Sequence, residues 1–65
     1  MNAKRIQEIR ESLKRKKENN CLDQTVYVRF EEYNGSGMAA AKAINEAYPD
    51  LRAYPSGDGI RIALR

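Results

Sequence analysis

Apolar residues recur with two different periods along the chain, and these periods separate helices from strands. In residues 3–18, Ile6, Ile9 and Leu13 follow the i, i+3, i+7 spacing of an amphipathic helix. From Thr25 to Tyr33 apolar and polar residues alternate, which is typical of a strand with one buried side. The pattern therefore predicts a first helix followed by a first strand.

The second half of the chain repeats this change of period. A second helix is predicted from Gly37 to Tyr48, where Pro49 ends it. Its apolar side consists of Ala40, Ala41, Ile44, Ala47 and Tyr48. Two short strands follow, Leu51–Tyr54 and Ile60–Leu64. The loop between them contains the Pro and Gly residues of a reversing turn, so we expect a hairpin.

The order α-β-α-β-β predicts one small α+β domain spanning residues 1–65. The first strand reaches the second through a helix, and we expect this crossover to be right-handed. The simplest sheet has the last strand in the middle, antiparallel to both of its neighbours. Both helices pack on one face of this sheet. Residues 21–65, the β-α-β-β core, resemble half of a ferredoxin-like fold in topology alone, with a basic amphipathic helix in residues 1–20 added in front. The predicted core is Ile6, Ile9, Leu13, Val26, Val28, Phe30, Ile44, Tyr48, Leu51, Ile60, Ile62 and Leu64.

The composition excludes most kinds of catalytic and metal-binding site. The chain has 65 residues, one cysteine and no histidine, so an internal disulfide, a Cys/His zinc site and a Ser–His or Cys–His nucleophile pair are all excluded. Glu31 and Glu32 are neighbours on a predicted strand and point to opposite faces, so they do not form an acid–base pair. We therefore expect no enzyme, no cofactor and no metal site. Cys21 is either a small buried apolar residue or a reactive thiol.

Location is predicted from what the sequence lacks. The first residues are charged from Lys4 onward and contain no apolar run, unlike a signal peptide. No stretch approaches the roughly 20 apolar residues of a membrane span. A single unpaired thiol fits a reducing compartment. We expect a cytoplasmic protein without a membrane partner.

One glycine-rich segment matches the spacing of a dinucleotide-binding loop. Gly35, Gly37 and Ala40 fit G-x-G-x-x-G/A, and Asp58 lies near the offset of a ribose-binding acid. However, the following strand turns back as a hairpin, and too little chain remains for the parallel sheet that such a site needs. We interpret the segment as a turn and a helix cap, with a weak anion site at Gly35, Ser36 and Gly37.

Positive charge is concentrated at the N-terminal end. The net charge is +3, and residues 1–20 contain seven basic and three acidic residues, whereas residues 21–65 contain five and six. Four consecutive basic residues close the first predicted helix: Lys14, Arg15, Lys16 and Lys17. This asymmetry indicates an acidic partner. The alternative is an ordinary solvated helix face.

The alternation of all three strands defines a second surface, on the side of the sheet away from the helices. The predicted residues are Tyr27, Arg29, Glu31, Arg52, Tyr54, Arg61, Ala63 and Arg65. Arginine and tyrosine suit phosphates and stacked bases, and they are also enriched where proteins bind one another. In one alternative they only cover the solvated side of the sheet. In another, the first helix covers this face.

Two classes of function follow. The first is a non-enzymatic module that binds nucleic acid or a nucleoprotein complex through this face and the Lys14–Lys17 run. The second is an inhibitor or other interaction module that docks on a larger complex. In size and composition alone, the chain resembles inhibitors made by phages and mobile elements, including anti-CRISPR proteins. We expect a monomer, or a homodimer formed through the first helix.

Overall fold

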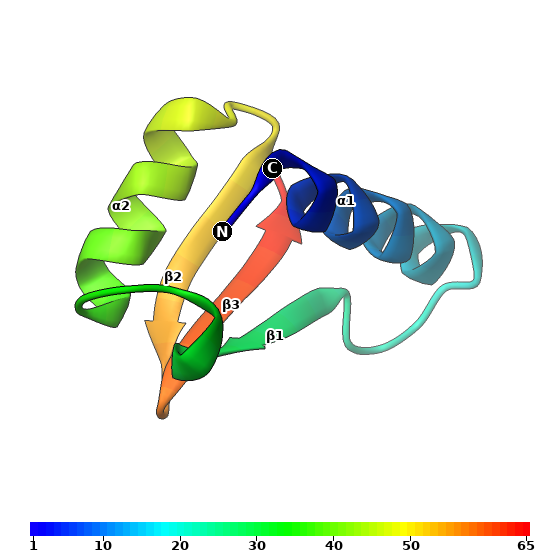
Figure 1. Ribbon diagram of the computed structural model, residues 1–65. Helices are drawn as coiled ribbons and strands as arrows, with labels where there is room; N and C mark the ends of the chain where they lie inside the picture. Colours follow the sequence, from blue (N-terminus) through cyan, green and yellow to red (C-terminus); the bar gives the residue numbers. More distant parts are fainter.

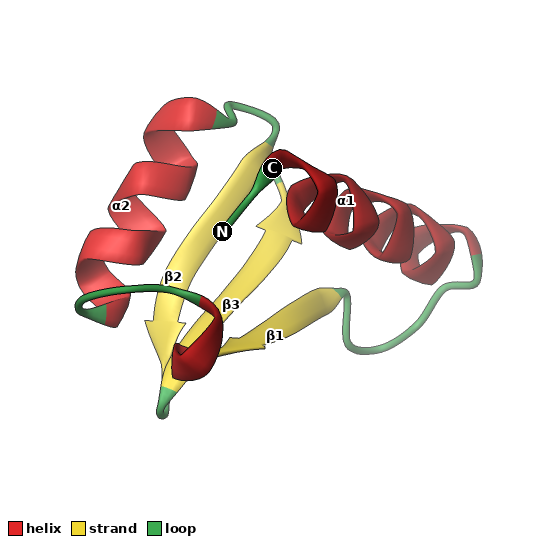
Figure 2. Ribbon diagram, viewed as in Figure 1, coloured by secondary structure: helices red, strands yellow, loops and turns green.

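The computed structural model describes residues 1–65 and confirms the predicted order of elements. These are α1 (Ala3–Glu18), β1 (Thr25–Arg29), a 3₁₀ turn η1 (Phe30–Glu32), α2 (Gly37–Ala47), β2 (Leu51–Ser56) and β3 (Gly59–Leu64). The strands form one antiparallel sheet in the order β1-β3-β2. Both helices pack on the same face of the sheet (Figures 1 and 2). The α+β fold with a central last strand is therefore confirmed, and α1 does not cover the opposite face.

Helix α1 has the limits that its sequence predicts. The Asn2 side chain accepts a hydrogen bond from the Arg5 N–H at 2.9 Å, so it caps the first turn. At the other end Asn20 adopts a left-handed conformation with φ of 53°, which asparagine tolerates better than most residues. The last turn of α1 contains Arg15, Lys16 and Lys17, whose positive charges complement the helix dipole.

One apolar core joins both helices to the sheet. The buried residues are Ile6, Ile9, Leu13, Val28, Ala41, Ile44, Leu51, Ala53, Ile60 and Ile62. Three further members of the predicted core, Val26, Tyr48 and Leu64, are partly buried against this cluster. Ala41 and Ala53 enter the core because helix α2 lies close to β2. Neither helix is long and apolar enough to cross a membrane.

Two arginines in the first half and middle of α1 bind carboxylates of the neighbouring segments and so tie the helix to the rest of the fold. Arg10 binds Asp50 through two hydrogen bonds of 2.8 and 3.0 Å, and its guanidinium lies 5.2 Å from the centre of the Tyr48 ring. Arg5 binds Glu32 of η1 at 2.8 Å. The hydrogen bond from Arg10 lowers the pKa of Asp50 and raises that of Arg10.

Helix α2 is joined to β2 through one side chain. The Asn45 amide donates to the Ala53 carbonyl at 2.9 Å and accepts from the Ala53 N–H at 2.7 Å. Both backbone groups of Ala53 are thereby satisfied on the side of β2 that faces away from β3. The helix ends at Ala47, one residue before the predicted limit.

The predicted extension of the first strand to Tyr33 is wrong. Arg29 pairs with Gly59, the first residue of β3, so a strand continued through Phe30 would lie opposite the hairpin turn and find no partner. The chain forms η1 instead, and Phe30 is 54% exposed. Phe30 is therefore not a core residue, while Tyr33 packs against the core.

The hairpin is tighter than predicted, because β2 runs to Ser56 and β3 starts at Gly59. Only Gly57 and Asp58 connect the strands. Gly57 has φ of +58° and Asp58 does not have positive φ, the pattern of a type II′ turn. Pro55 fits within β2 because the strand lies at the edge of the sheet.

Candidate binding surface of the sheet

The strand register places six of the predicted residues on the face opposite the helices: Tyr27 and Arg29 of β1, Arg52 and Tyr54 of β2, and Arg61 and Ala63 of β3. Tyr27, Arg61 and Tyr54 lie directly opposite one another across β1, β3 and β2. Arg52 lies two residues before Tyr54, in the next row, opposite Ala63. We call Tyr27, Arg52, Tyr54 and Arg61 the Arg/Tyr face.

Within the Arg/Tyr face each ring lies beside a guanidinium. The Arg61 Cζ is 5.4 Å from the centre of the Tyr27 ring, and the Arg52 Cζ is 5.7 Å from that of Tyr54. Such cation–π contacts help to hold both rings and guanidinium groups in place. The Tyr27 ring also lies over Gly59, where an added Cβ would be 3.1 Å from the Tyr27 Cζ.

Two of the predicted arginines have carboxylates of their own. Arg29 Nε is 3.1 Å from Glu31 Oε1, and Arg61 Nη1 is 3.6 Å from Asp23 Oδ2. Arg61 Nη1 also donates to the Thr25 hydroxyl at 3.0 Å. Glu31 reaches Arg29 from η1, not from the strand position that the alternation predicts. The sequence does not predict Asp23 as a neighbour of Arg61, because Asp23 lies in the connection before β1 and belongs to no repeating pattern.

Asp23 is held in its charged form. The Thr25 hydroxyl donates to Asp23 Oδ1 at 2.6 Å and the Thr25 N–H at 3.0 Å, and these bonds are the main reason that the pKa of Asp23 is lowered. The positive charges of Lys16 and Arg61 lower it further. A fixed carboxylate thus stands beside Arg61 at the start of β1.

The other two predicted arginines differ in their freedom. Arg52 is exposed and forms no salt bridge. The Arg65 guanidinium donates to the Leu51 carbonyl at 3.3 and 3.4 Å and is thereby tied to the beginning of β2. Of the four, Arg52 is therefore the one with no carboxylate or carbonyl partner.

The basic end of α1 divides in a similar way. Lys16 is half-buried, and its Nζ donates to the Thr25 carbonyl at 2.7 Å, so it links the helix to β1. Lys14, Arg15 and Lys17 are exposed and form no salt bridge. These three charges are free to attract an acidic partner. Through Lys16 and Thr25, the end of α1 meets the Arg/Tyr face at the start of β1.

The glycine-rich segment forms a turn and a helix cap. Gly35 has φ of +83°, and the Ser36 hydroxyl accepts the Ala39 N–H at 3.1 Å where α2 begins at Gly37. Every strand pair in the sheet is antiparallel, so the parallel strand of a dinucleotide site is missing. The weak anion site at Gly35, Ser36 and Gly37 stays a prediction.

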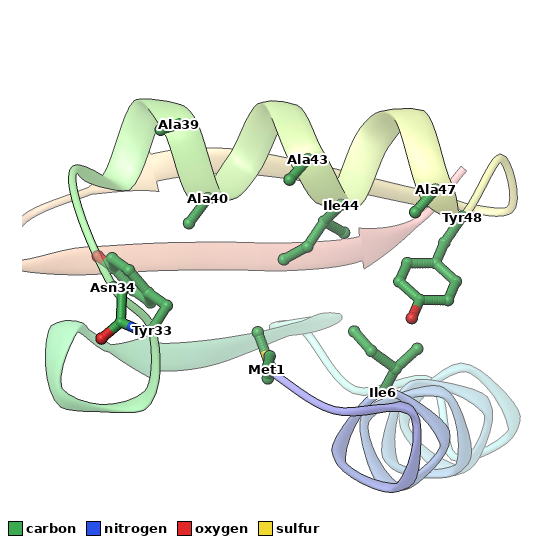
Figure 3. A pocket seen from close by; sticks show the side chains of 10 residues that line it. All are labelled: Met1, Ile6, Tyr33, Asn34, Ala39, Ala40, Ala43, Ile44, Ala47 and Tyr48. Atoms are coloured by element: carbon green, nitrogen blue, oxygen red, sulfur yellow. The ribbon is translucent and has the colours of Figure 1, made fainter.

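The opposite side of the molecule carries an apolar groove between α1 and α2 (Figure 3). Its volume is about 410 Å³, and its lining residues are Met1, Ile6, Tyr33, Asn34, Ala39, Ala40, Ala43, Ile44, Ala47 and Tyr48. The sequence signal for it is the spacing of Ala39, Ala43 and Ala47, which share one side of α2. Cys21 is exposed and lies outside both surfaces, so it is not a buried apolar residue.

Comparisons of the chain with protein-family models, with curated proteins and with solved structures found no match. No group of three or more His, Cys, Asp and Glu side chains is placed to hold a metal ion. What supports a function is thus the geometry of the chain itself.

Proposed function

We propose that the protein is a non-enzymatic module that binds nucleic acid through the Arg/Tyr face. The observation that carries this proposal is the row Tyr27–Arg61–Tyr54, in which a cation lies between two rings across three strands. Aromatic rings stack on bases, and an arginine fork binds a phosphate with two hydrogen bonds. The row thus alternates the two kinds of group that a nucleotide chain requires.

The spacing of the two rings favours unpaired bases. Neighbouring strands lie about 4.8 Å apart, so Tyr27 and Tyr54, on the two outer strands, are separated by roughly 10 Å. Successive bases in a duplex follow one another at about 3.4 Å and expose no faces to a flat surface. Each ring would therefore receive one splayed base of a single strand, with Arg61 near the phosphates between them.

The carboxylates beside two of the arginines should weaken the contribution of those arginines to binding. A phosphate that binds Arg29 or Arg61 has to compete with Glu31 or Asp23, respectively. Arg52 has no such competitor. We therefore expect Arg52 to contribute more to affinity than Arg29, with Lys14 and Lys17 adding long-range attraction.

Fluorescence anisotropy with labelled oligonucleotides tests the proposal. A single strand should bind more tightly than a duplex of the same sequence, and its affinity should fall with salt at a slope of roughly −0.7 per phosphate contact. Tyr54→Ala should lose about 1–3 kcal/mol of binding free energy, the usual contribution of one stacked base. Met38→Ala changes an exposed side chain of α2 on the other side of the sheet; it is the control and should bind like the parent.

A second function, docking on a protein, is favoured by the mixed charge of the same surface. Arg29 with Glu31 and Arg61 with Asp23 present both signs side by side, which suits a partner that also carries both. Arginine and tyrosine anchor many protein interfaces. An absence of oligonucleotide binding even at low salt would reject the nucleic-acid proposal and favour an inhibitor that docks on a larger complex.

A further inference from the structure

The outer edge of β1 has backbone groups that nothing in the chain satisfies. In an antiparallel sheet the N–H and C=O of one residue point toward the same side, and alternate residues point to opposite sides. The Thr25 N–H binds Asp23 and its C=O binds Lys16, so Thr25 points away from β3. Tyr27 points the same way, and neither its N–H nor its C=O has a partner on that side.

Exposed apolar side chains accompany this free edge. Leu22 is fully exposed just before β1, Phe30 is 54% exposed just after it, and Tyr27 in its middle is 39% exposed. The other large exposed apolar residues are only Met1 and Met38. Three of the five therefore lie on β1 or within three residues of its ends, where unpaired backbone groups favour the addition of another strand.

We propose that a second copy of this chain pairs with β1 in antiparallel fashion, about a two-fold axis at Tyr27. Tyr27 would then lie opposite Tyr27 of the second copy, and the two residues would exchange both of their outward backbone hydrogen bonds. Thr25 would lie opposite Arg29 without a backbone hydrogen bond, because its N–H and C=O stay bound to Asp23 and Lys16. Because opposite strands run in reverse, Leu22 of each copy approaches Phe30 of the other. A symmetric pair of this kind uses the same surface on both copies, as most homodimers do.

Charge complementarity favours a second copy over an unrelated strand. In this register Arg29 of one copy lies diagonally across from Asp23 of the other, and both pairs form at once. The Lys16 Nζ lies 2.7 Å from the Thr25 carbonyl oxygen, at the first end of β1. In the pair, η1 of the second copy, which contains Glu31, would approach this same end. The basic end of α1 in each copy would therefore lie near the acidic turn η1 of the other copy.

The pairing would also enlarge the surface described above. Side chains directly opposite in a sheet point to the same face, so both Arg/Tyr faces would share one side of a continuous sheet made from two sets of three strands. The helices of both copies would share the other side. A nucleotide chain or a protein partner would then meet a surface twice as wide.

Size-exclusion chromatography with light scattering tests the pairing without any nucleic acid, so the result does not depend on the proposed function. The mass should rise from 7.4 kDa toward twice this value as concentration increases. Amide exchange at Tyr27 should slow over the same concentrations. The Ala53 amide should exchange equally at all concentrations, because Asn45 binds it within each copy.

Two matched variants locate the interface. Phe30→Lys adds a charge beside the edge and should raise the dissociation constant roughly tenfold or more. Met38→Lys makes the same change at an exposed side chain of α2 and should leave the dissociation constant unaltered. The proposal is overturned by a monomeric mass with concentration-independent exchange at Tyr27. It is equally overturned if Met38→Lys, but not Phe30→Lys, abolishes the dimer.

Discussion

The two edges of the sheet are built differently. On β2, Asn45 binds both backbone groups of Ala53, the Leu51 N–H donates to the Tyr48 carbonyl at 3.0 Å, and Pro55 has no N–H. No N–H of β2 remains free to begin a new ladder. On β1, by contrast, the backbone of Tyr27 points outward without a partner.

The difference shows how a small sheet directs association to one side. Proline and capped backbone groups are common devices that prevent strands from adding at an edge. Here both devices lie on β2, while β1 is blocked only at its first residue by Asp23 and Lys16. Any added strand would therefore enter beside the Arg/Tyr face.

The largest expected effect on stability comes from a core substitution in β3, the central strand that pairs with both edge strands. Ile62 is completely buried on β3 between Val26 and Ala53. Ile62→Ala should lower the free energy of unfolding by about 2–5 kcal/mol, because it leaves a cavity in a small core. Phe30→Ala should change it by no more than about 0.5 kcal/mol. Urea denaturation measures both, and a larger loss for Phe30→Ala would mean that β1 continues beyond Arg29.

A second change should weaken the β1 side selectively. A Cβ at Gly59 would collide with the Val28 carbonyl and press on Tyr27. Gly59→Ala should cost about 1–3 kcal/mol and speed amide exchange at Val28. Ser56→Ala, opposite Gly59 on β2, is the control. Equal loss of protection at Val28 in both variants would contradict this explanation.

Removal of the Asn45 side chain should make the β2 edge resemble the β1 edge. Asn45→Ala leaves both backbone groups of Ala53 without a protein partner and should cost about 1–2 kcal/mol. Exchange of the Ala53 amide should become fast, and self-association should increase. Asn45→Asp keeps an oxygen that accepts the Ala53 N–H but loses the NH₂ group that donates to the Ala53 carbonyl. This variant should therefore keep the Ala53 amide protected from exchange. Unchanged exchange at Ala53 in Asn45→Ala would show that the edge is covered in another way.

The smallest effect is on pH dependence, with one carboxylate near each edge. The pKa values of Asp23 and Asp50 are both lowered in the folded state, so their contribution is present above the ordinary value of 3.8 and is lost as pH falls through the folded value. Thermal melting should therefore begin at lower temperature below about pH 4. Asp50→Asn or Asp23→Asn should each make the melting temperature depend less on pH. If the melting temperature of a variant falls with pH as steeply as that of the parent, the carboxylate of that residue does not contribute to the acid sensitivity.

The sequence predicts the parts of this structure that depend on local periods. The spacing of Ile6, Ile9 and Leu13 predicts α1 to the residue, and alternation predicts which residues of β2 and β3 share a face. The end of β1 is not local, because it depends on where β3 begins. Phe30 therefore looked buried although it lies opposite a turn.

The candidate site shows the same limit. The alternation places Tyr27, Tyr54 and Arg61 on one face, but it does not show that Asp23 lies beside Arg61 or that Lys16 binds Thr25. These partners come from a connection and a helix end, which follow no repeating pattern. The role of Asn45 likewise depends on how closely α2 approaches β2.

The tight hairpin between β2 and β3 has a consequence for the order of folding. Its two-residue turn brings β2 and β3 together over a very short loop, whereas Arg29 of β1 has to find Gly59, 30 positions away in sequence. Closing a long loop costs more entropy before any contact compensates for it. We expect the hairpin and α2 to form the folding nucleus, with β1 and α1 docking last. Changes at Gly57 should then slow folding, and changes along α1 should mainly speed unfolding.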